Sequence, residues 1–199
     1  MHPNPLFRSE DRDFLDALIG EIGFGKVFLT TPDGPRVAHT PFVLKEGGRL
    51  CFHLARSNAL TANLDGARAL ALVDGPHGYV SPRWYENRAT VPTWDYVALE
   101  LEGPVRKLAD DELEALLHEL IVKHEADLGG EAWEASETPE DIWAALLKAI
   151  AGFELQTETT RPTIKLSQKK SSAELARIAE AHAANGNEAL ADMMRQEMP

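Results

Sequence analysis

The sequence predicts an α+β fold in which a small antiparallel barrel carries helices on its outside. The first observation is a β-prone run at residues 26–31, joined to a second run at 36–45 by the turn Pro32-Asp33-Gly34. The second is another turn, Gly47-Gly48, before a third run at residues 49–55. Two tight turns so close together favour antiparallel pairing, because a parallel crossover needs more chain than these turns supply.

Helical spacing of apolar residues predicts the outer layer. Ser9 is placed to cap a first helix whose apolar stripe includes Phe14, Leu18 and Ile22. Residues 110–128 form an amphipathic helix, and Thr138 with Pro139 opens another. We expect the remaining elements to be a short helix at 58–64, strands at 67–74, 96–108 and 153–160, and two helices within 171–198 that are broken at Asn185-Gly186-Asn187. Gly103-Pro104 should bend its strand or place it at a sheet edge.

Composition limits the classes of partner. The 199-residue chain has a formal net charge of −12, which works against non-specific adhesion to nucleic acid. The last predicted helix carries one arginine, Arg195, among several acids, so we expect no direct DNA binding. The single cysteine, Cys51, excludes an internal disulfide and suits the cytoplasm. No apolar run is long enough to predict a membrane span.

Residues 53–58 form the first candidate site, where a predicted strand ends. Arg56 offers a forked cation, Ser57 a hydroxyl, and Asn58 is placed near the free backbone N–H groups of a helix start. These groups suit a phosphate. The alternative is a helix cap beside a solvated arginine, and spacing alone leaves both open.

Residues 164–170 form a second, weaker candidate. Lys165, Ser167 and Gln168 would complete an anion site or touch a flavin edge, although a solvated strand end would have the same composition. His77 is expected in a Gly-rich turn, where a histidine more often has a structural role than a catalytic one. No Cys/His cluster has zinc spacing, so we predict no metal site.

Residues 75–99 gather five aromatic side chains and a histidine around three prolines. Aromatic rings bring large rigid area and proline restricts the backbone that presents them, so this segment predicts a shaped wall for a flat ligand or a partner subunit. Residues 75–85 (GPHGYVSPRWY) and 91–98 (VPTWDYVA) closely resemble the PaiB-like family of FMN-binding negative transcriptional regulators. Further matching segments follow the same order at 38–41 (AHTP), 53–58 (HLARSN), 152–154 (GFE) and 165–168 (KLSQ).

The resemblance implies an α+β fold of the antiparallel split β-barrel type, with peripheral helices and a C-terminal helical tail. Such barrels are related to flavin reductases and pyridoxamine phosphate oxidases, and the resemblance implies a homodimer with FMN at the subunit interface. Residues 1–170 would be the FMN-binding domain and residues 171–199 the tail. By the same resemblance, the FMN phosphate would be held by Arg56, Ser57 and Asn58. The ring system would lie beside His53 and Leu54, with Thr40 and Pro41 on the next strand. The site would be closed by Lys165, Ser167 and Gln168, and Trp94 with His77 would form part of its wall.

Three functions remain open at this stage. The resemblance favours a homodimeric, cytoplasmic FMN-dependent regulator or sensor that acts through partners. A flavin-dependent oxidoreductase on a small molecule is the second hypothesis, because this fold class hosts such enzymes. A haem-binding split barrel is the third, with His39, His53 and His77 as the available axial ligands.

Overall fold

The computed structural model describes residues 2–196, and this part of the chain divides into two compact units. The central unit comprises Asp16–Val73 and Glu100–Thr160. The terminal unit comprises Met1–Leu15, Asp74–Leu99 and Arg161–Pro199. Strands β5, β6 and β8 run from one unit into the other, as their ranges below show. The predicted boundary at residue 170 stays a prediction.

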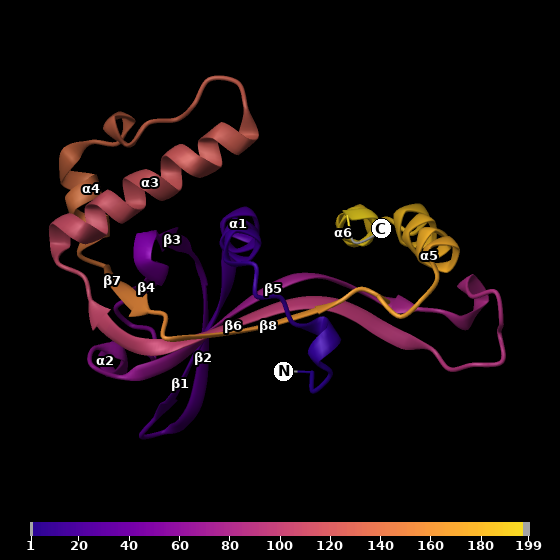
Figure 1. Cartoon of the computed structure of the whole chain (residues 1–199). Coiled ribbons are helices and arrows are strands. Elements are labelled where there is room, and N and C mark those ends of the chain that lie inside the picture. Colours follow the sequence, from indigo (N-terminus) through magenta and orange to yellow (C-terminus); the bar gives the residue numbers. More distant parts are fainter. Residues whose placement is uncertain (1, 197–199) are drawn as a thin grey trace. The chain divides into compact units, whose positions relative to one another are not determined.

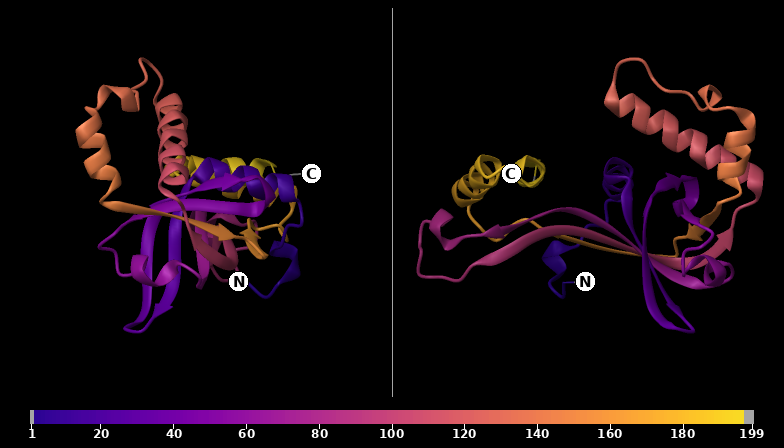
Figure 2. Two further views of the ribbon diagram at one scale, coloured as in Figure 1. Left: turned by 90° about the vertical axis from the view of Figure 1, so that its left-hand side faces the viewer. Right: turned by 180° about the vertical axis from the view of Figure 1, so that it is seen from behind.

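The strands form one sheet in the order β2-β1-β5-β6-β7-β4-β3, and β8 also pairs with β6 (Figure 1). Neighbouring strands pair antiparallel, including β1 with β2 and β4 with β7. Helices lie outside the sheet, so the predicted α+β class is confirmed (Figure 2). The strands are β1 Phe24–Thr31, β2 Gly34–Pro41, β3 Val43–Lys45, β4 Arg49–Ala55, β5 Arg68–Val80, β6 Thr93–Lys107, β7 Ile150–Gln156 and β8 Thr159–Lys165; the helices are α1 Arg12–Ile22, α2 Thr61–Leu64, α3 Asp110–Leu128, α4 Glu140–Leu147, α5 Ser172–Ala184 and α6 Glu188–Gln196.

Both predicted hairpin turns are present, but the second predicted strand is interrupted. The β1–β2 turn closes at Gly34, whose φ of 98° suits a residue without a Cβ. Phe42 separates β2 from β3, its backbone N–H donating to the carbonyl of Gly23 at 2.8 Å. Its ring is buried and meets Phe52 edge-on. The strand predicted at residues 36–45 is therefore divided into β2 and β3 at the residue whose ring is buried.

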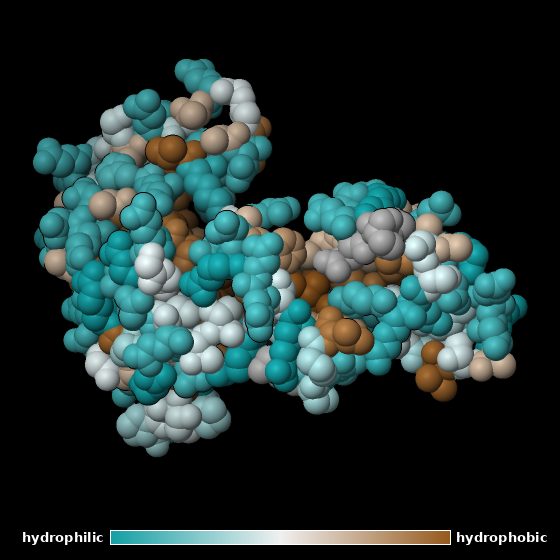
Figure 3. All heavy atoms as spheres, viewed as in Figure 1, coloured by the Kyte–Doolittle hydropathy of each residue, from teal (hydrophilic) through white to brown (hydrophobic). Residues whose placement is uncertain are grey.

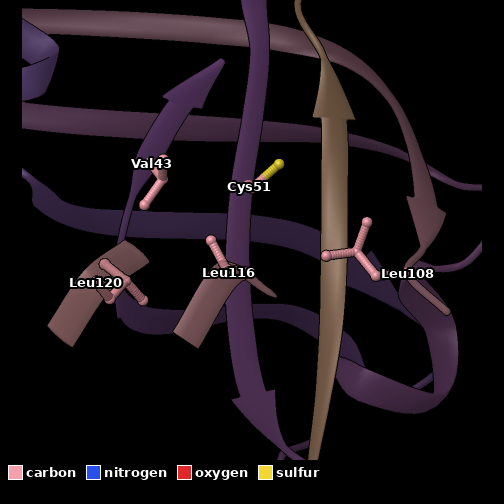
Figure 4. Packing of buried hydrophobic residues seen from close by; sticks show 5 residues of the cluster. All are labelled: Val43, Cys51, Leu108, Leu116 and Leu120. Atoms are coloured by element: carbon pink, nitrogen blue, oxygen red, sulfur yellow. The ribbon is translucent and has the colours of Figure 1, made fainter. Parts of the chain in front are cut away.

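The core of the central unit lies between α3 and the strands β3, β4 and β7. Leu116 and Leu120 of α3 pack with Val43 and Cys51 (Figure 4). Leu108, just before α3, joins the same buried cluster. The apolar spacing predicted for 110–128 is therefore the face that α3 buries.

The predicted strand at 153–160 is two strands, β7 and β8, separated after Gln156. A Cβ at Gly103 would lie 1.8 Å from the carbonyl oxygen of Gln156, so glycine permits this close approach of β6 and the end of β7. Of the two alternatives predicted for Gly103-Pro104, the sheet edge is wrong, because β6 has neighbours on both sides in the sheet, and the bend stays a prediction.

In the terminal unit, β5 continues through residue 80, well beyond the predicted end at 74. The aromatic segment 75–99 is therefore mostly strand, and only residues 81–92 connect β5 with β6. A Cβ at Gly78 would lie 2.6 Å from Cε1 of His182, so a side chain here would push against α5.

Three helix starts differ from prediction. The first helix begins at Arg12, where Asp11 accepts a hydrogen bond from the backbone of Phe14, so Ser9 is not its cap. The residue before α4 is Pro139, and Thr138 lies outside the helix. The short helix predicted at 58–64 is confined to Thr61–Leu64. Among residues 2–196, no helix has both the length and the apolar character needed to cross a membrane.

Candidate functional site

Arg56 follows directly after β4, and two hydrogen bonds to the segment before β7 hold it in place. Its backbone N–H donates to the carbonyl of Ala149 and its Nε to the carbonyl of Lys148, each at 2.8 Å. Within the described part of the chain, the two outer nitrogens of its guanidinium have no hydrogen-bond partner. The side chain is exposed, so Arg56 is oriented by its inner edge and presents a two-pronged cation to solvent.

A turn follows Arg56, and it differs from the predicted helix start. The backbone N–H of Asn58 donates to the carbonyl of Ala55, and its side-chain Oδ1 accepts from the N–H of Leu60 at 3.0 Å. Asn58 therefore shapes the turn, and its carboxamide oxygen is already engaged. Ser57 is exposed, and its hydroxyl and backbone N–H have no partner among the described residues.

His53 lies on β4, three residues before Arg56. Its Nδ1 is buried without a hydrogen-bond partner among the described residues, and burial lowers the pKa of the imidazole. Thr40 of β2 is buried, and its hydroxyl donates to the carbonyl of His53 at 2.7 Å. Pro41 ends β2, and Leu54 faces the core with 4% of its surface exposed.

In the terminal unit, Asp95 organises two of the predicted site residues. Its carboxyl is fully buried, accepts a hydrogen bond from the Ser167 hydroxyl at 2.5 Å, and lies 3.4 Å from Nζ of Lys165. Burial raises the pKa of Asp95, while Ser167 and Lys165 act in the opposite direction. Lys165 also donates to the Thr93 hydroxyl and the Trp94 carbonyl. Asp95 was not among the predicted site residues, although it lies within the motif WDY.

Gln168 uses its carboxamide locally. Its oxygen accepts from the backbone N–H of Leu166 at 2.9 Å, and its nitrogen donates to the carbonyl of Ile164. Ser167 between them has a φ of 61°, the only positive value among the described residues other than glycine. This tight turn aims Ser167 at Asp95 and leaves Gln168 as a residue that shapes the loop.

His77 and Trp94 lie side by side on β5 and β6. The indole Nε1 of Trp94 donates to Nδ1 of His77 at 3.2 Å, and the ring centroids are 5.9 Å apart. Tyr79 meets the same indole edge-on, at 6.3 Å. Trp94 and Tyr79 are each about half exposed, so these rings present an aromatic face to solvent.

The predicted site residues divide between the two units. The central unit holds the strand-end and turn residues Thr40, Pro41, His53, Leu54, Arg56, Ser57 and Asn58, and the terminal unit holds His77, Trp94, Lys165, Ser167 and Gln168. The assembly of these two groups around one ligand stays a prediction.

Comparison with known proteins agrees with the motifs. The model of the family described as "Putative FMN-binding domain" matches residues 1–159. The chain belongs to this family. A relative of this chain, "Protease synthase and sporulation protein PAI 2" of Bacillus subtilis, is 27% identical over 184 residues, which cover 90% of this chain and 88% of the relative. The resemblance predicted from residues 75–98 is thereby confirmed. The description of the family names FMN, which is the cofactor that the resemblance implied.

Solved structures confirm the fold. The flavocytochrome Anf3 from Azotobacter vinelandii aligns with a TM-score of 0.59 at 16% identity, covering 83% of this chain and 72% of that chain. An FAD- and haem-binding protein from Mycobacterium smegmatis aligns with a TM-score of 0.56 at 21% identity, covering 79% and 72%. The FMN-binding domain thus has the predicted split-barrel class of fold.

The groups at the end of β4 fit the phosphate of FMN. A phosphate dianion needs several donors, and the outer guanidinium nitrogens of Arg56 with the hydroxyl and N–H of Ser57 supply them without breaking any described bond. The unpartnered Nδ1 of His53 is a second polar atom that a ligand could satisfy. The donor set is thus chemically matched to the cofactor of the family.

Proposed function

We propose that this chain is an FMN-binding regulator or sensor, in which the end of β4 binds the cofactor phosphate. The observation that supports this most is Arg56, whose Nε is fixed on the Lys148 carbonyl while its outer nitrogens face solvent. A cation oriented in this way binds a dianion without first losing side-chain freedom.

The neighbouring residues would have separate tasks. Ser57 would donate its hydroxyl and backbone N–H to the phosphate, and Asn58 would hold the turn that positions both. His53, neutral because burial lowers its pKa, would hydrogen-bond the ring system. Bound FMN would supply one- or two-electron redox chemistry.

Titration of the purified chain with FMN and with riboflavin tests the phosphate assignment. We expect Arg56→Ala to weaken FMN binding about tenfold or more, since a charge-assisted contact to a dianion is lost. Riboflavin lacks the phosphate, so its affinity should be unchanged. Arg36→Ala is the matched control, because Arg36 is an exposed arginine of the same unit whose described hydrogen bond is to the Pro35 carbonyl. An equal loss for both flavins, or none, would refute the assignment.

The regulatory part of the proposal rests on the family resemblance and on the name of the Bacillus relative, a sporulation protein. We propose a homodimer that acts through protein partners in the cytoplasm, with no direct contact to DNA. Light scattering with and without FMN measures the assembly, and a gel-shift assay on promoter DNA tests the last point. A monomer at all concentrations, or a specific DNA shift, would contradict this part alone.

Haem binding is a second candidate, favoured by His53. Its imidazole is held neutral by burial and its Nδ1 has no described partner, which suits an axial ligand. The Mycobacterium smegmatis protein of similar fold is described as binding FAD and haem. The absorption spectrum of freshly purified protein separates the two: a two-band yellow spectrum means flavin, and an intense Soret band means haem. Rapid reduction of bound flavin by NADH or NADPH would favour an oxidoreductase over a sensor.

A further inference from the structure

The central unit contains two adjoining hollows beside α3, away from the strand end described above. The first, of about 500 Å³, lies between α3 and residues 132–136. The second, of about 420 Å³, extends toward the start of α4. Both are lined by His118, Ala135 and Ser136, so they adjoin, and the two together are termed here the acidic trough. Its size is that of a small-molecule site.

Aromatic rings form much of the wall of the acidic trough. Trp133 lines the first hollow and is 38% exposed, while Trp143 lines the second. The imidazole of His118 lies between the two hollows, 5.4 Å from the ring of Trp143. Hydrophobic residues are visible among hydrophilic ones in the part of the molecule that carries α3 and α4 (Figure 3). The exposed indole of Trp133 is available to stack on a ligand, while Trp143 is half-buried.

Three carboxylates of the acidic trough are held in place by neutral donors. Glu114 accepts from the indole Nε1 of Trp143 at 2.8 Å, and Glu125 accepts from the backbone N–H of Trp133 at 3.0 Å. Glu134 accepts from the hydroxyl of Ser136 at 3.2 Å. Within the described part of the chain, none of the three has an ion-pair partner. Their negative charge is therefore oriented but not neutralised by the protein.

The surrounding sequence strengthens this charge. Residues 110–141 contain twelve aspartates and glutamates and a single lysine, so this segment accounts for nearly all of the chain's net charge of −12. The lysine, Lys123, donates to the carbonyl of Gly20 and does not line the trough. No arginine or lysine lines either hollow. Anionic ligands would be repelled, while cations would be attracted from a distance.

We propose that the acidic trough binds a small organic cation, a protonated or quaternary amine attached to an apolar body. In the first hollow, Glu125 and Glu134 would neutralise the ammonium group and Trp133 would pack on its apolar body. Glu114 and Trp143 line the second hollow, where the charge of Glu114 would add to the attraction from a distance. An ammonium over an indole face gains electrostatic attraction in addition to the apolar contact, so both features of the trough favour the same ligand. This site is separate from the residues assigned to FMN.

Calorimetric titration of the full chain with benzyltrimethylammonium chloride tests the proposal, with neutral benzyl alcohol as comparison. We expect saturable binding of the cation, at least about tenfold tighter than of the alcohol. The triple variant E114Q/E125Q/E134Q should lose about tenfold in affinity. Glutamine keeps an acceptor oxygen for each of the three described hydrogen bonds, so the fold should persist. Trp133→Leu, which removes a ring but no charge, should also weaken binding and reduce the fluorescence change on titration.

The control is D111N/D127N/E131Q, which removes the same charge from the same segment outside the lining of the trough. It should change the affinity less than about twofold at physiological salt, because separated exposed charges are screened. Equal binding of cation and alcohol, an equal loss in the control, or no saturation by about 10 mM would overturn the proposal. FMN affinity should be unchanged in every trough variant, so this test is independent of the one on Arg56.

Discussion

The guanidinium of Arg106 donates from Nε to Oε1 of Glu154 at 2.9 Å, and Glu154 is almost completely buried. The same arginine forms a two-pronged contact with Glu112, at 2.8 Å for each bond. Arg106 and the backbone N–H of Ala109 lower the pKa of Glu112 to about 2. Arg106 therefore links the end of β6 to β7 and to the first turn of α3.

Replacing Arg106 should destabilise the central unit. Arg106→Met leaves the Glu154 carboxylate with Arg49 alone, at 3.3 Å, so a buried charge loses its main partner. We expect a loss of about 2 kcal/mol in the free energy of unfolding, less than for a fully buried pair because Arg106 is partly exposed. Urea unfolding measures it. The control is Arg195→Met, which removes an exposed pair with Glu188 and should leave the transition midpoint unchanged.

Stability should fall as the pH drops below about 6.5. His182 is 3% exposed, with Nε2 unpartnered among the described residues, and burial lowers its pKa. Burial also lowers the pKa of His53. The unfolded chain therefore binds more protons than the folded one as the pH falls through the unfolded pKa, so the stabilisation is complete above it and is lost below it.

Unfolding in urea between pH 5 and 8 measures this dependence. His182→Leu should reduce the slope of stability against pH by up to about one proton's contribution, and His53→Leu should do the same independently. The exposed His124 provides the control, because His124→Leu should leave the slope unchanged. An identical slope in all four proteins would show that neither buried imidazole is responsible.

Glycine at position 78 should be needed for the packing of α5 on β5. In Gly78→Ala the new Cβ would lie 2.6 Å from Cε1 of His182 and 2.9 Å from Nδ2 of Asn187, so the buried His182 ring and the Asn187 carboxamide must be displaced. We expect a destabilisation of about 1–3 kcal/mol. Gly20→Ala is the matched control: it lies within α1 with no atom close to the new Cβ, and it should stabilise by up to about 1 kcal/mol. Thermal unfolding of the two variants should shift in opposite directions.

Cys51 should react slowly with thiol reagents in the folded protein. Burial, with the charge of Glu154 as a second cause, raises the pKa of its thiol to about 11. Little thiolate therefore exists at pH 8, and the side chain is 4% exposed. The rate of reaction with dithionitrobenzoate should rise by orders of magnitude when urea unfolds the chain. A fast reaction of the native protein would contradict the buried environment described here.

Patterns local in sequence predicted the regular elements well. Strand β4 and helix α3 have the predicted bounds, since alternating and helical apolar spacing are properties of a few neighbouring residues. The pair α5 and α6, broken at Asn185–Asn187, is also as expected. Apart from three helix starts, the errors in the sheet lie where residues distant in the sequence meet. The predicted strand is interrupted at Phe42, whose ring packs edge-on against Phe52. The missing side chain of Gly103 allows the end of β7 to lie close to β6.

The candidate site shows the same division. Residue types offered Arg56 as one of two open alternatives for a phosphate-binding cation, the family resemblance favoured that role, and motifs spread along the chain identified the family and its cofactor. The bonds to the carbonyls of Lys148 and Ala149, which orient Arg56, join residues about ninety positions apart and have no signal in the sequence. Asp95 was likewise missed, because its burial and its contacts with Lys165 and Ser167 exist only after folding.

The sequence by itself determined the α+β class, the family, the FMN cofactor and the acidic character of residues 110–141. The class and the acidic character depend on residue types and short-range spacing, whereas the family and its cofactor follow from the resemblance of several motifs to a known family. The tertiary structure alone decided which donors remain unpaired, which carboxylates are buried or exposed, and where indoles and glutamates meet beside α3. Hydrogen-bond satisfaction and burial are properties of residues brought together from distant parts of the chain, and they exist only once those residues share a surface.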